Sequence, residues 1–253
     1  MKKKTVILVA VRLKSKRLKN KAILPLNNKP LIIQLTHRIK KSNKSSDIIW
    51  CTSTNKKDDP LENLGKKNKI KVFRGSEKDV MLRFILAAKK YKAKNIVRVT
   101  GDNPLTDPKV IDFLIEKHNK NKNDYTCCNS IPNGTRPEVI SLHALKKCHK
   151  LIQDPNSTEY MTWMLNRPDY FKVGNIIFPQ KELNRPNISL TVDTKEDYKS
   201  VAKIYTHFKT SLPSLIKIIK WIDTKPNLLR KLTKRKMGKI GKKNINFKFK
   251  DDF

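Results

Sequence analysis

The feature that most limits the possible folds is the alternation of short apolar runs with amphipathic helical patterns. Apolar runs predict strands at Thr5–Val11, Ile48–Thr52, Lys71–Phe73 and Asn95–Thr100, and the segments between them have helical periodicity. A further helix is expected to begin at Pro108. Strands that alternate with helices in this way are typical of a parallel-rich sheet in an α/β fold.

The pattern is less regular in the second half of the chain. Strands are expected at Asp124–Asn129, Glu138–Ser141, Phe171–Ile176 and Ile188–Val192, and helices at Leu142–Ile152, Thr158–Asn166 and Lys195–His207. Because there is no internal repeat and no long linker, we expect one domain over residues 1–223 with an inserted lobe at about 124–187. Residues 224–253 are rich in lysine and poor in apolar residues, which predicts a basic tail that is peripheral or disordered.

The charge of the chain is strongly positive. It has 57 Lys and Arg residues against 22 Asp and Glu residues, for a formal net charge of +35. This charge is compatible with a non-enzymatic protein that binds nucleic acid, and it also attracts small anions such as nucleoside triphosphates. The basic residues are spread along the chain, mostly as lysine, and the aromatic residues (7%) are not interleaved with them. We therefore expect no specific nucleic-acid partner.

The cysteines and the apolar runs indicate a cytoplasmic protein without a membrane span. The four cysteines form no Cys-x-x-Cys pair and no Cys/His cluster with zinc spacing, so reduced and buried thiols are expected. Cys127 and Cys128 are neighbours in a predicted strand and should point to opposite faces of the sheet. No apolar run is long enough to cross a bilayer, and Val6–Val11 predicts a first strand rather than part of a signal peptide.

Two aspartates each follow a predicted strand. Asp102 comes directly after the fourth strand, in a turn where Gly101 permits a tight, left-handed backbone and Pro104 prevents the strand from continuing. Asp193 follows the predicted strand Ile188–Val192. Each residue alone is explained as a turn former or a helix cap. At the ends of neighbouring strands, however, the two carboxylates can hold Mg²⁺ against a triphosphate.

A basic loop lies between the first predicted strand and the first helix. Backbone N–H groups, a helix terminus and cations that converge on such a loop suit the phosphates of a nucleotide. The spacing of a Walker loop is absent, and in a lysine-rich chain a cluster of cations is a weak signal by itself. The loop contains Arg12, Lys14, Ser15, Lys16, Arg17, Lys19 and Lys21.

An ordered set of short motifs adds to this interpretation. The chain contains Val9-Ala-Val-Arg-Leu-Lys-Ser-Lys-Arg-Leu-Lys-Asn-Lys21, Thr52-Ser-Thr-Asn55 with Asp58-Asp-Pro-Leu61, Phe73-Arg-Gly-Ser-Glu-Lys-Asp-Val80, Thr100-Gly-Asp-Asn-Pro-Leu105, Pro137-Glu-Val-Ile-Ser141 and Thr191-Val-Asp-Thr-Lys-Glu-Asp197. In this order the motifs resemble the cytidylyltransferases that activate acidic sugars, which include the acylneuraminate and 3-deoxy-manno-octulosonate (Kdo) enzymes. The branch that is most similar contains the spore-coat polysaccharide protein SpsF. The resemblance extends from about Val6 to Tyr205.

The resemblance implies a fold and a reaction. The fold is the Rossmann-like fold of nucleotide-diphospho-sugar transferases, a mostly parallel sheet with a small inserted lobe. The reaction is transfer of CMP from CTP to an acidic sugar of the nonulosonic or ulosonic type, with release of pyrophosphate, for surface polysaccharide or glycan synthesis. Mg²⁺ is the implied cofactor. Relatives are commonly dimers through the inserted lobe, so a homodimer is expected.

The resemblance also implies site residues. Asp102 and Asp193 match the metal-binding carboxylates, and Arg12, Lys21 and Asp102 are the expected catalytic residues. Glu138 falls in the lobe that would face the acceptor sugar. The implied nucleotide-binding residues are Arg12, Ser15, Arg17 and Lys21 at the phosphates, and Arg74, Ser76 and Asp79 in the segment that lines the nucleotide or sugar site.

The motifs depart from the family pattern, and other functions of the same fold stay open. Lys14 stands where the family usually has glycine, and Lys19-Asn20 stand where it usually has Pro-Gly. The alternatives are a nucleotidyltransferase for another acceptor and a sugar-nucleotide glycosyltransferase. A glycosyltransferase usually has an Asp-x-Asp metal motif after a strand, and Asp58-Asp59 lacks that spacing.

Overall fold

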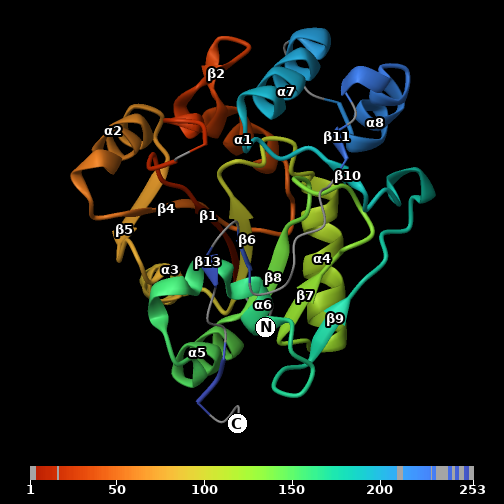
Figure 1. The fold of residues 1–253 in the computed structure, drawn as a ribbon. Helices are drawn as coiled ribbons and strands as arrows, with labels where there is room; N and C mark the ends of the chain where they lie inside the picture. Colours follow the sequence, from red (N-terminus) through yellow and green to blue (C-terminus); the bar gives the residue numbers. More distant parts are fainter. Residues whose placement is uncertain are drawn as a thin grey trace.

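A seven-stranded sheet forms the centre of the molecule. The computed structural model describes residues 4–15, 17–209, 213–228, 230–231, 239–240, 243–244 and 248–250. The strand order is β5-β4-β1-β6-β8-β7-β9 (Figure 1). Only β8 runs antiparallel to its neighbours in this sheet, which confirms the mostly parallel α/β fold. The strands are β1 (Thr5–Ala10), β4 (Ile48–Ser53), β5 (Lys71–Gly75), β6 (Asn95–Thr100), β7 (Tyr125–Cys127), β8 (Glu138–Ser141) and β9 (Val173–Asn175).

Helices cover both faces of the sheet (Figure 1). α3, α5 and α6 contribute to the apolar core on one face, and α1, α2, α4, α7 and α8 contribute to the core on the other. The α-helices are α1 (Leu31–Ile39), α2 (Asp59–Lys67), α3 (Val80–Lys90), α4 (Pro108–Asn121), α5 (Leu142–Leu151), α6 (Met161–Leu165), α7 (Lys195–Phe208) and α8 (Leu215–Asp223). The 3₁₀ helices are η1 (Lys21–Ile23), η2 (Lys56–Asp58), η3 (Pro155–Tyr160), η4 (Lys181–Leu183) and η5 (Pro226–Leu228).

Burial on both faces explains why the central strand β1 has a continuous apolar run, Val6–Val9, instead of alternating apolar and polar residues. In β1, Ile7 and Val9 belong to one core, and Val6 and Leu8 belong to the other. The same alternation separates the two neighbouring cysteines. Cys128 lies in the core with α1, and Cys127 lies in the core with α3, as the sequence predicts. The four cysteines are free and buried.

The segment before α7 differs from its prediction. Only Ile188–Ser189 forms a strand, β10, and it pairs with β11 (Arg230–Lys231) rather than with the central sheet. The next residue, Leu190, donates its backbone N–H to the Asn133 carbonyl at 2.8 Å. The expectation that Asp193 ends a neighbouring strand of the main sheet is therefore wrong.

Two helical regions also differ from the expectation. The predicted helix Thr158–Asn166 is η3 followed by α6, so the chain is tighter in its first half than an α-helix. α8 is absent from the sequence-based prediction. Its apolar residues Leu215, Ile218, Ile219 and Ile222 have helical spacing and are buried, and this spacing is the signal that could have predicted it.

Most of the predicted tail, 224–253, lies outside the described residues. Two short hairpin partners in it, β12 (Lys239–Ile240) and β13 (Lys243–Asn244), pair with each other, as β2 (Pro25–Leu26) pairs with β3 (Lys29–Pro30) earlier in the chain. Residues 248–250 lie against α5: Phe249 is fully buried and forms a bridge with Ile152. These last residues are packed on the domain.

Candidate active site at the carboxyl ends of β1 and β6

β1 and β6 end side by side, with Ala10 in register with Thr100. The chain turns after β6 at Gly101, whose backbone N–H donates to the Ala10 carbonyl at 2.8 Å. A Cβ atom at Gly101 would lie 2.9 Å from the Val11 side chain, so glycine is needed because the two loops approach closely. Among the described glycines only Gly134 has a positive φ, and the expected left-handed conformation of Gly101 is therefore wrong.

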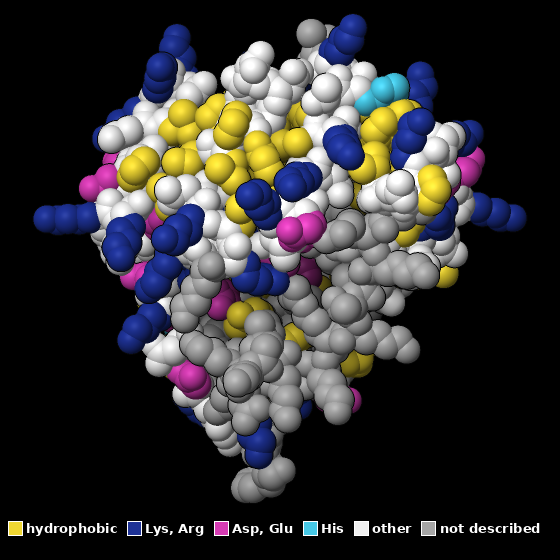
Figure 2. All heavy atoms as spheres, turned by 45° about the horizontal axis from the view of Figure 1, so that its top comes forward, with side chains coloured by type: hydrophobic (Ala, Val, Ile, Leu, Met, Phe, Trp, Pro, Cys, Tyr) yellow, Lys and Arg dark blue, Asp and Glu magenta, His cyan; other side chains and the backbone are white. Residues whose placement is uncertain are grey.

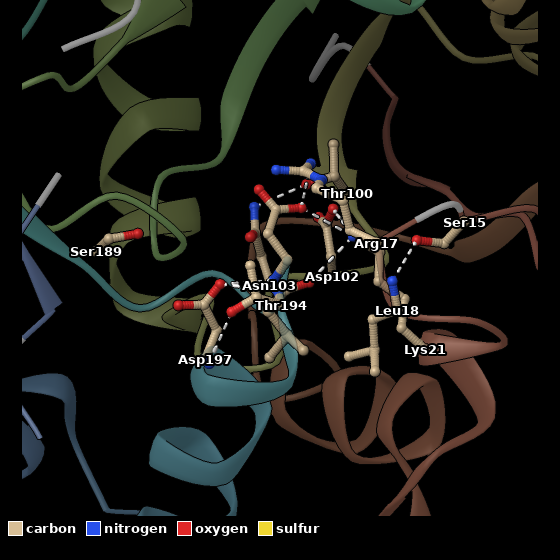
Figure 3. A network of polar contacts seen from close by, with 12 residues as sticks. Ser15, Arg17, Leu18, Lys21, Thr100, Asp102, Asn103, Ser189, Thr194 and Asp197 are labelled. Carbon is tan, nitrogen blue, oxygen red and sulfur yellow. Dashed lines mark hydrogen bonds and ion pairs between the residues drawn. The ribbon is translucent and has the colours of Figure 1, made fainter. Parts of the chain in front are cut away.

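Lys21 lies between the two aspartates that the sequence suggests as metal carboxylates. Its Nζ donates to Asp102 Oδ2 at 2.7 Å, to Asp193 Oδ1 at 3.1 Å and to the Val192 carbonyl at 3.0 Å. The exposed fraction of the side chain is 14% for Lys21, 25% for Asp102 and 13% for Asp193. Figure 3 shows how this polar network joins the loop after β1, the loop after β6 and the start of α7.

These contacts determine the charge state of the cluster. Burial alone would lower the pKa of Lys21, but the carboxylates of Asp102 and Asp193 outweigh it and raise that pKa above its ordinary value. Burial acts to raise the pKa of Asp102, but the Lys21 ammonium and several hydrogen bonds hold it below its ordinary value. At neutral pH, Lys21 is therefore a cation and Asp102 an anion.

Asp193 reaches this position through contacts between loops. The Val192 N–H donates to the Asp102 carbonyl at 2.9 Å, which ties the two segments together. The residue that caps α7 is Thr194, whose hydroxyl accepts from the Asp197 N–H at 3.2 Å while Asp197 accepts from the Thr194 N–H at 2.9 Å. The Asp193 carboxylate instead faces the cations of the basic loop.

Three other cations of the basic loop, Arg12, Lys14 and Arg17, also contact carboxylates from distant segments. Arg17 is the second cation on Asp193, and Lys14 and Arg12 contact residues of the β5–α3 loop and of η3. The pairs are Arg17 Nη2–Asp193 Oδ1 at 2.9 Å, Lys14 Nζ–Glu77 Oε1 at 3.0 Å and Arg12 Nη2–Glu159 Oε2 at 2.6 Å. Lys16 lies outside the described residues. The loop thus presents these cations toward acidic groups from several segments of the chain.

Asp58 holds the basic loop in place, a role that the sequence did not suggest. Its buried carboxylate accepts from the Leu13 N–H at 2.8 Å through Oδ1. Its Oδ2 accepts from the Ser53 hydroxyl at 2.5 Å and from the Ser53 N–H at 3.3 Å. Asp58 belongs to the motif Asp58-Asp-Pro-Leu61, and this motif was the sequence signal that could have pointed to its role.

The backbone of the loop explains one departure from the family pattern. Asn20, which stands where glycine is usual, has φ 54° and ψ 25°, the left-handed conformation. Asparagine tolerates this conformation better than other residues with a side chain. Ser15 shapes the same loop, because its Oγ accepts from the Leu18 N–H at 3.4 Å. Lys14, which also stands where glycine is usual, has a side chain that is 60% exposed.

Arg74 is engaged with the segment that joins β4 to α2. Its Nη1 contacts Glu62 at 2.8 Å and its Nη2 contacts Asp59 at 2.7 Å. Its Nε donates to the Ser53 carbonyl at 3.0 Å. These contacts raise the pKa of Arg74, chiefly through Glu62. Arg74 therefore braces the strand and helix beside the basic loop.

Ser76 and Asp79 form the start of α3. The Ser76 hydroxyl accepts from the Asp79 N–H at 3.0 Å, and Asp79 caps the helix by accepting from the Leu82 N–H at 2.9 Å. The Asp79 carboxylate also contacts the Thr158 hydroxyl at 2.8 Å and His149 Nε2 at 2.7 Å. Asp79 therefore connects α3 to η3 and α5, and Ser76 supports the turn that positions Asp79.

Glu138, the first residue of β8, is the centre of a buried polar cluster. Its Oε2 contacts Arg98 Nη1 at 2.6 Å, and its Oε1 accepts from the Tyr125 hydroxyl at 2.5 Å and the Thr162 hydroxyl at 2.7 Å. Burial, and then the Glu138 charge, raise the pKa of Tyr125 well above its ordinary value. Arg98 Nη2 also donates to the Glu159 carbonyl at 3.2 Å, which connects Glu138 to the residue that pairs with Arg12.

A mostly parallel sheet with these loops at its carboxyl edge is the fold of the nucleotide-diphospho-sugar transferases. The family model for cytidylyltransferases matches residues 6–233 of the chain. The chain therefore belongs to the cytidylyltransferase family. Among the described residues, no helix combines the length and the apolar character that crossing a bilayer needs.

Curated relatives cover most of the chain. The uncharacterized protein MJ1063 of Methanocaldococcus jannaschii is 38% identical over 89% of this chain and 93% of its own length. The spore coat polysaccharide biosynthesis protein SpsF of Bacillus subtilis is 32% identical over 79% of this chain and 85% of its own. A 3-deoxy-manno-octulosonate cytidylyltransferase of Chloroherpeton thalassium is 27% identical over 73% of this chain and 70% of its own.

A solved structure agrees with the family assignment. The chain is similar to a cytidylyltransferase from Leptospira borgpetersenii, with a TM-score of 0.83 and 27% identity. The match covers 92% of this chain and all of that one. The predicted resemblance to cytidylyltransferases is thereby confirmed.

Proposed function

We propose that this protein transfers CMP from CTP to a hydroxyl group of an acidic sugar and releases pyrophosphate, for the synthesis of a surface polysaccharide or glycan. The observation that carries the proposal is the contact of the basic loop with Asp102 and Asp193 in a member of the cytidylyltransferase family. The names of two relatives support the acceptor class, since one is a spore coat polysaccharide protein and one a 3-deoxy-manno-octulosonate cytidylyltransferase.

The basic loop supplies the charges that the proposed reaction needs. The acceptor hydroxyl attacks the α-phosphate in line with the departing pyrophosphate, and negative charge accumulates on the phosphate oxygens. Arg12, Arg17 and Lys21 neutralise that charge in our proposal, and they are oriented before the substrate arrives because each contacts a carboxylate. The side chain and backbone of Ser15 shape the loop around the phosphates.

Mg²⁺ is the cofactor that we propose. It is commonly bound through one or two carboxylates together with substrate phosphates, and it keeps several waters. Asp102 and Asp193 fit this donor set, because an oxygen of each lies within 3.1 Å of one shared nitrogen. Among the described residues no group of three or more His, Cys, Asp and Glu side chains could hold a metal. When bound, the ion shields charge on the α-phosphate and on pyrophosphate.

An acidic acceptor suits the charge of the molecule. Lys and Arg side chains outnumber acidic ones over the face shown in Figure 2, and they attract anionic substrates. We assign Glu138 to the acceptor side as a positioning residue, because from β8 it holds Arg98 of β6 at 2.6 Å. Because Arg98 also donates to the Glu159 carbonyl, the Glu138–Arg98 pair joins η3 to the central sheet. Arg74, Ser76 and Asp79 are proposed to shape the nucleotide side from β5 and α3.

The test is pyrophosphate release with Mg²⁺, each of the four common ribonucleoside triphosphates and a panel of acidic sugars. We expect turnover with CTP alone, and a loss of about a hundredfold or more in the Asp102→Asn and Asp193→Asn variants. Lys29→Gln, an exposed charge change outside the site, is the matched control. Equal turnover with all four triphosphates, or full activity of both aspartate variants, would contradict the proposal.

The alternative functions give different results in the same assay. A nucleotidyltransferase for another acceptor binds CTP tightly but shows no turnover with any acidic sugar in the panel. A glycosyltransferase of this fold releases no pyrophosphate from CTP and instead consumes a sugar nucleotide. The proposed homodimer is tested separately by light scattering, which gives the mass of the particle in solution.

A further inference from the structure

We propose that the Lys21 ammonium is a built-in counter-ion that occupies the place between Asp102 and Asp193, and that it prevents a divalent metal from binding there until the nucleotide arrives. This inference rests on the proposed function of the same site. It concerns the order in which metal and nucleotide bind. It also assigns Lys21 a second role besides phosphate binding.

The hydrogen bonds of Lys21 show that its ammonium is fully engaged by groups of the protein itself. A lysine ammonium has three N–H donors and no acceptor. In the structure those donors have three acceptors, Asp102 Oδ2 at 2.7 Å, the Val192 carbonyl at 3.0 Å and Asp193 Oδ1 at 3.1 Å. No donor of Lys21 is left over for a phosphate oxygen. Lys21 must therefore give up at least one of these three acceptors, two of which are carboxylates, when a phosphate oxygen binds it.

The charges in the cluster balance without a metal. Asp102 and Asp193 supply two negative charges, and Lys21 and Arg17 supply two positive ones, since Arg17 Nη2 contacts the same Asp193 Oδ1 at 2.9 Å. A divalent cation that enters this neutral cluster gains little from the carboxylates and is repelled by the ammonium. The side chains of Lys21 and Asp193 are 14% and 13% exposed, so water screens this repulsion only in part.

Position also puts Lys21 and a metal in competition. A cation held by both carboxylates has to lie between Asp102 Oδ2 and Asp193 Oδ1, and Lys21 Nζ already lies there at hydrogen-bond distance from each. Mg²⁺ needs oxygen ligands at about 2.0–2.1 Å, closer than the ammonium, and the two cations cannot share this place. A triphosphate resolves the conflict, because its oxygens give Lys21 and Arg17 new partners and expose the carboxylates to the metal. Metal and nucleotide should therefore bind together.

The test measures metal binding without nucleotide. Mn²⁺, a paramagnetic substitute for Mg²⁺, is titrated into the nucleotide-free protein and the free ion is followed by electron paramagnetic resonance. We expect weak binding to the parent protein and binding that is tighter by about tenfold or more in the Lys21→Met variant, because one positive charge is removed from the site. Arg17→Met should give a smaller gain, since Arg17 is 57% exposed and contacts only one of the two carboxylates.

Controls locate the effect at the carboxylate pair. Lys19→Met removes an exposed lysine of the same loop and should leave Mn²⁺ affinity unchanged. The double variant Lys21→Met/Asp193→Asn should lose the gain. Lys21→Gln keeps polar donors without the charge, and it serves if Lys21→Met is poorly folded. Mn²⁺ affinity that is equal or lower in folded Lys21→Met and Lys21→Gln would overturn the inference.

These experiments distinguish the counter-ion role of Lys21 from the proposed function. If the parent enzyme turns over CTP and the Lys21 variants bind Mn²⁺ no more tightly, the function stands and the counter-ion role is wrong. If the Lys21 variants gain Mn²⁺ affinity and the parent neither binds nor uses CTP, the counter-ion role stands and the proposed reaction is wrong. Addition of CTP to the parent should lower free Mn²⁺ below the level that the same CTP gives without protein, which tests the joint binding.

Discussion

The Val192 N–H donates to the Asp102 carbonyl at 2.9 Å, and this one backbone contact places the two carboxylates of the candidate site together. Asp102 follows β6, whereas Val192 belongs to a segment outside the central sheet. The next residue, Asp193, is thereby brought to the side of Lys21 opposite Asp102. The site is thus assembled by loops that hydrogen-bond to each other, with only one of its two carboxylates at a sheet strand.

Removal of the Asp58 charge should loosen the basic loop. In Asp58→Asn we expect the free energy of unfolding to fall by about 1–3 kcal/mol, because the Leu13 and Ser53 donors lose a buried, charged acceptor. The KM for CTP should rise as well, since the loop is less well held. Asp59→Asn is the matched control, because its side chain is 48% exposed and the change should stay within about 0.5 kcal/mol. Urea denaturation measures the free energy of unfolding of both variants. Equal losses in Asp58→Asn and Asp59→Asn would argue against a special role for Asp58.

Asn20 should tolerate glycine but not a β-branched residue. Its φ of 54° lies in the left-handed region, which glycine adopts without a steric penalty. We expect Asn20→Gly to change the free energy of unfolding by less than about 0.5 kcal/mol and Asn20→Val to lower it by about 1–2 kcal/mol. Thermal unfolding of both variants is the measurement. A stable Asn20→Val protein would mean that the loop has another conformation.

Neutralising Glu138 should destabilise the protein, because Glu138 in β8 holds Arg98 of β6. Glu138 and Arg98 are 10% and 14% exposed, so Glu138→Gln leaves a mostly buried guanidinium without its counter-ion. We expect the free energy of unfolding to fall by about 3 kcal/mol. Tyr125→Phe removes only a neutral donor from the same carboxylate and should cost about 1 kcal/mol. The reverse order of the two losses in urea denaturation would contradict this account of the cluster.

The Lys21–Asp102 contact should stabilise the protein over a wide pH range. The pKa of Asp102 is lowered in the folded state, so its contribution is present above its ordinary value of 3.8 and is lost as the pH falls through the folded value. The pKa of Lys21 is raised, so its contribution is present below 10.5 and is lost as the pH rises through the folded value. The difference in unfolding free energy between the parent and Lys21→Met should therefore be constant from about pH 5 to pH 9. Urea denaturation at several pH values checks this, with Lys19→Met as the control, and a difference that changes sharply near pH 7 would count against it.

The fold was predictable to a large extent because its signals are local. The run Val6–Val11 is apolar at successive positions and Asn95–Thr100 is rich in Ile and Val, and the structure has strands there that are buried on both faces. The vicinal cysteines were assigned correctly to opposite faces, since side chains alternate along any strand. The segment Ile188–Val192 was mistaken for a sheet strand because its apolar pattern is the same whether it pairs with the sheet or with a loop.

The sequence by itself determined the strands, the helices with strong periodicity, the turn that presents Asp102 and the basic loop, because each depends on residues close together in the chain. Only the tertiary structure decided which charges meet. Lys21 contacts carboxylates 81 and 172 residues away, and Arg12 contacts one 147 residues away. In a chain with 57 basic residues nothing local distinguishes these pairs from other combinations. They form because the packed sheet and its loops bring particular carboxylates within reach of particular cations.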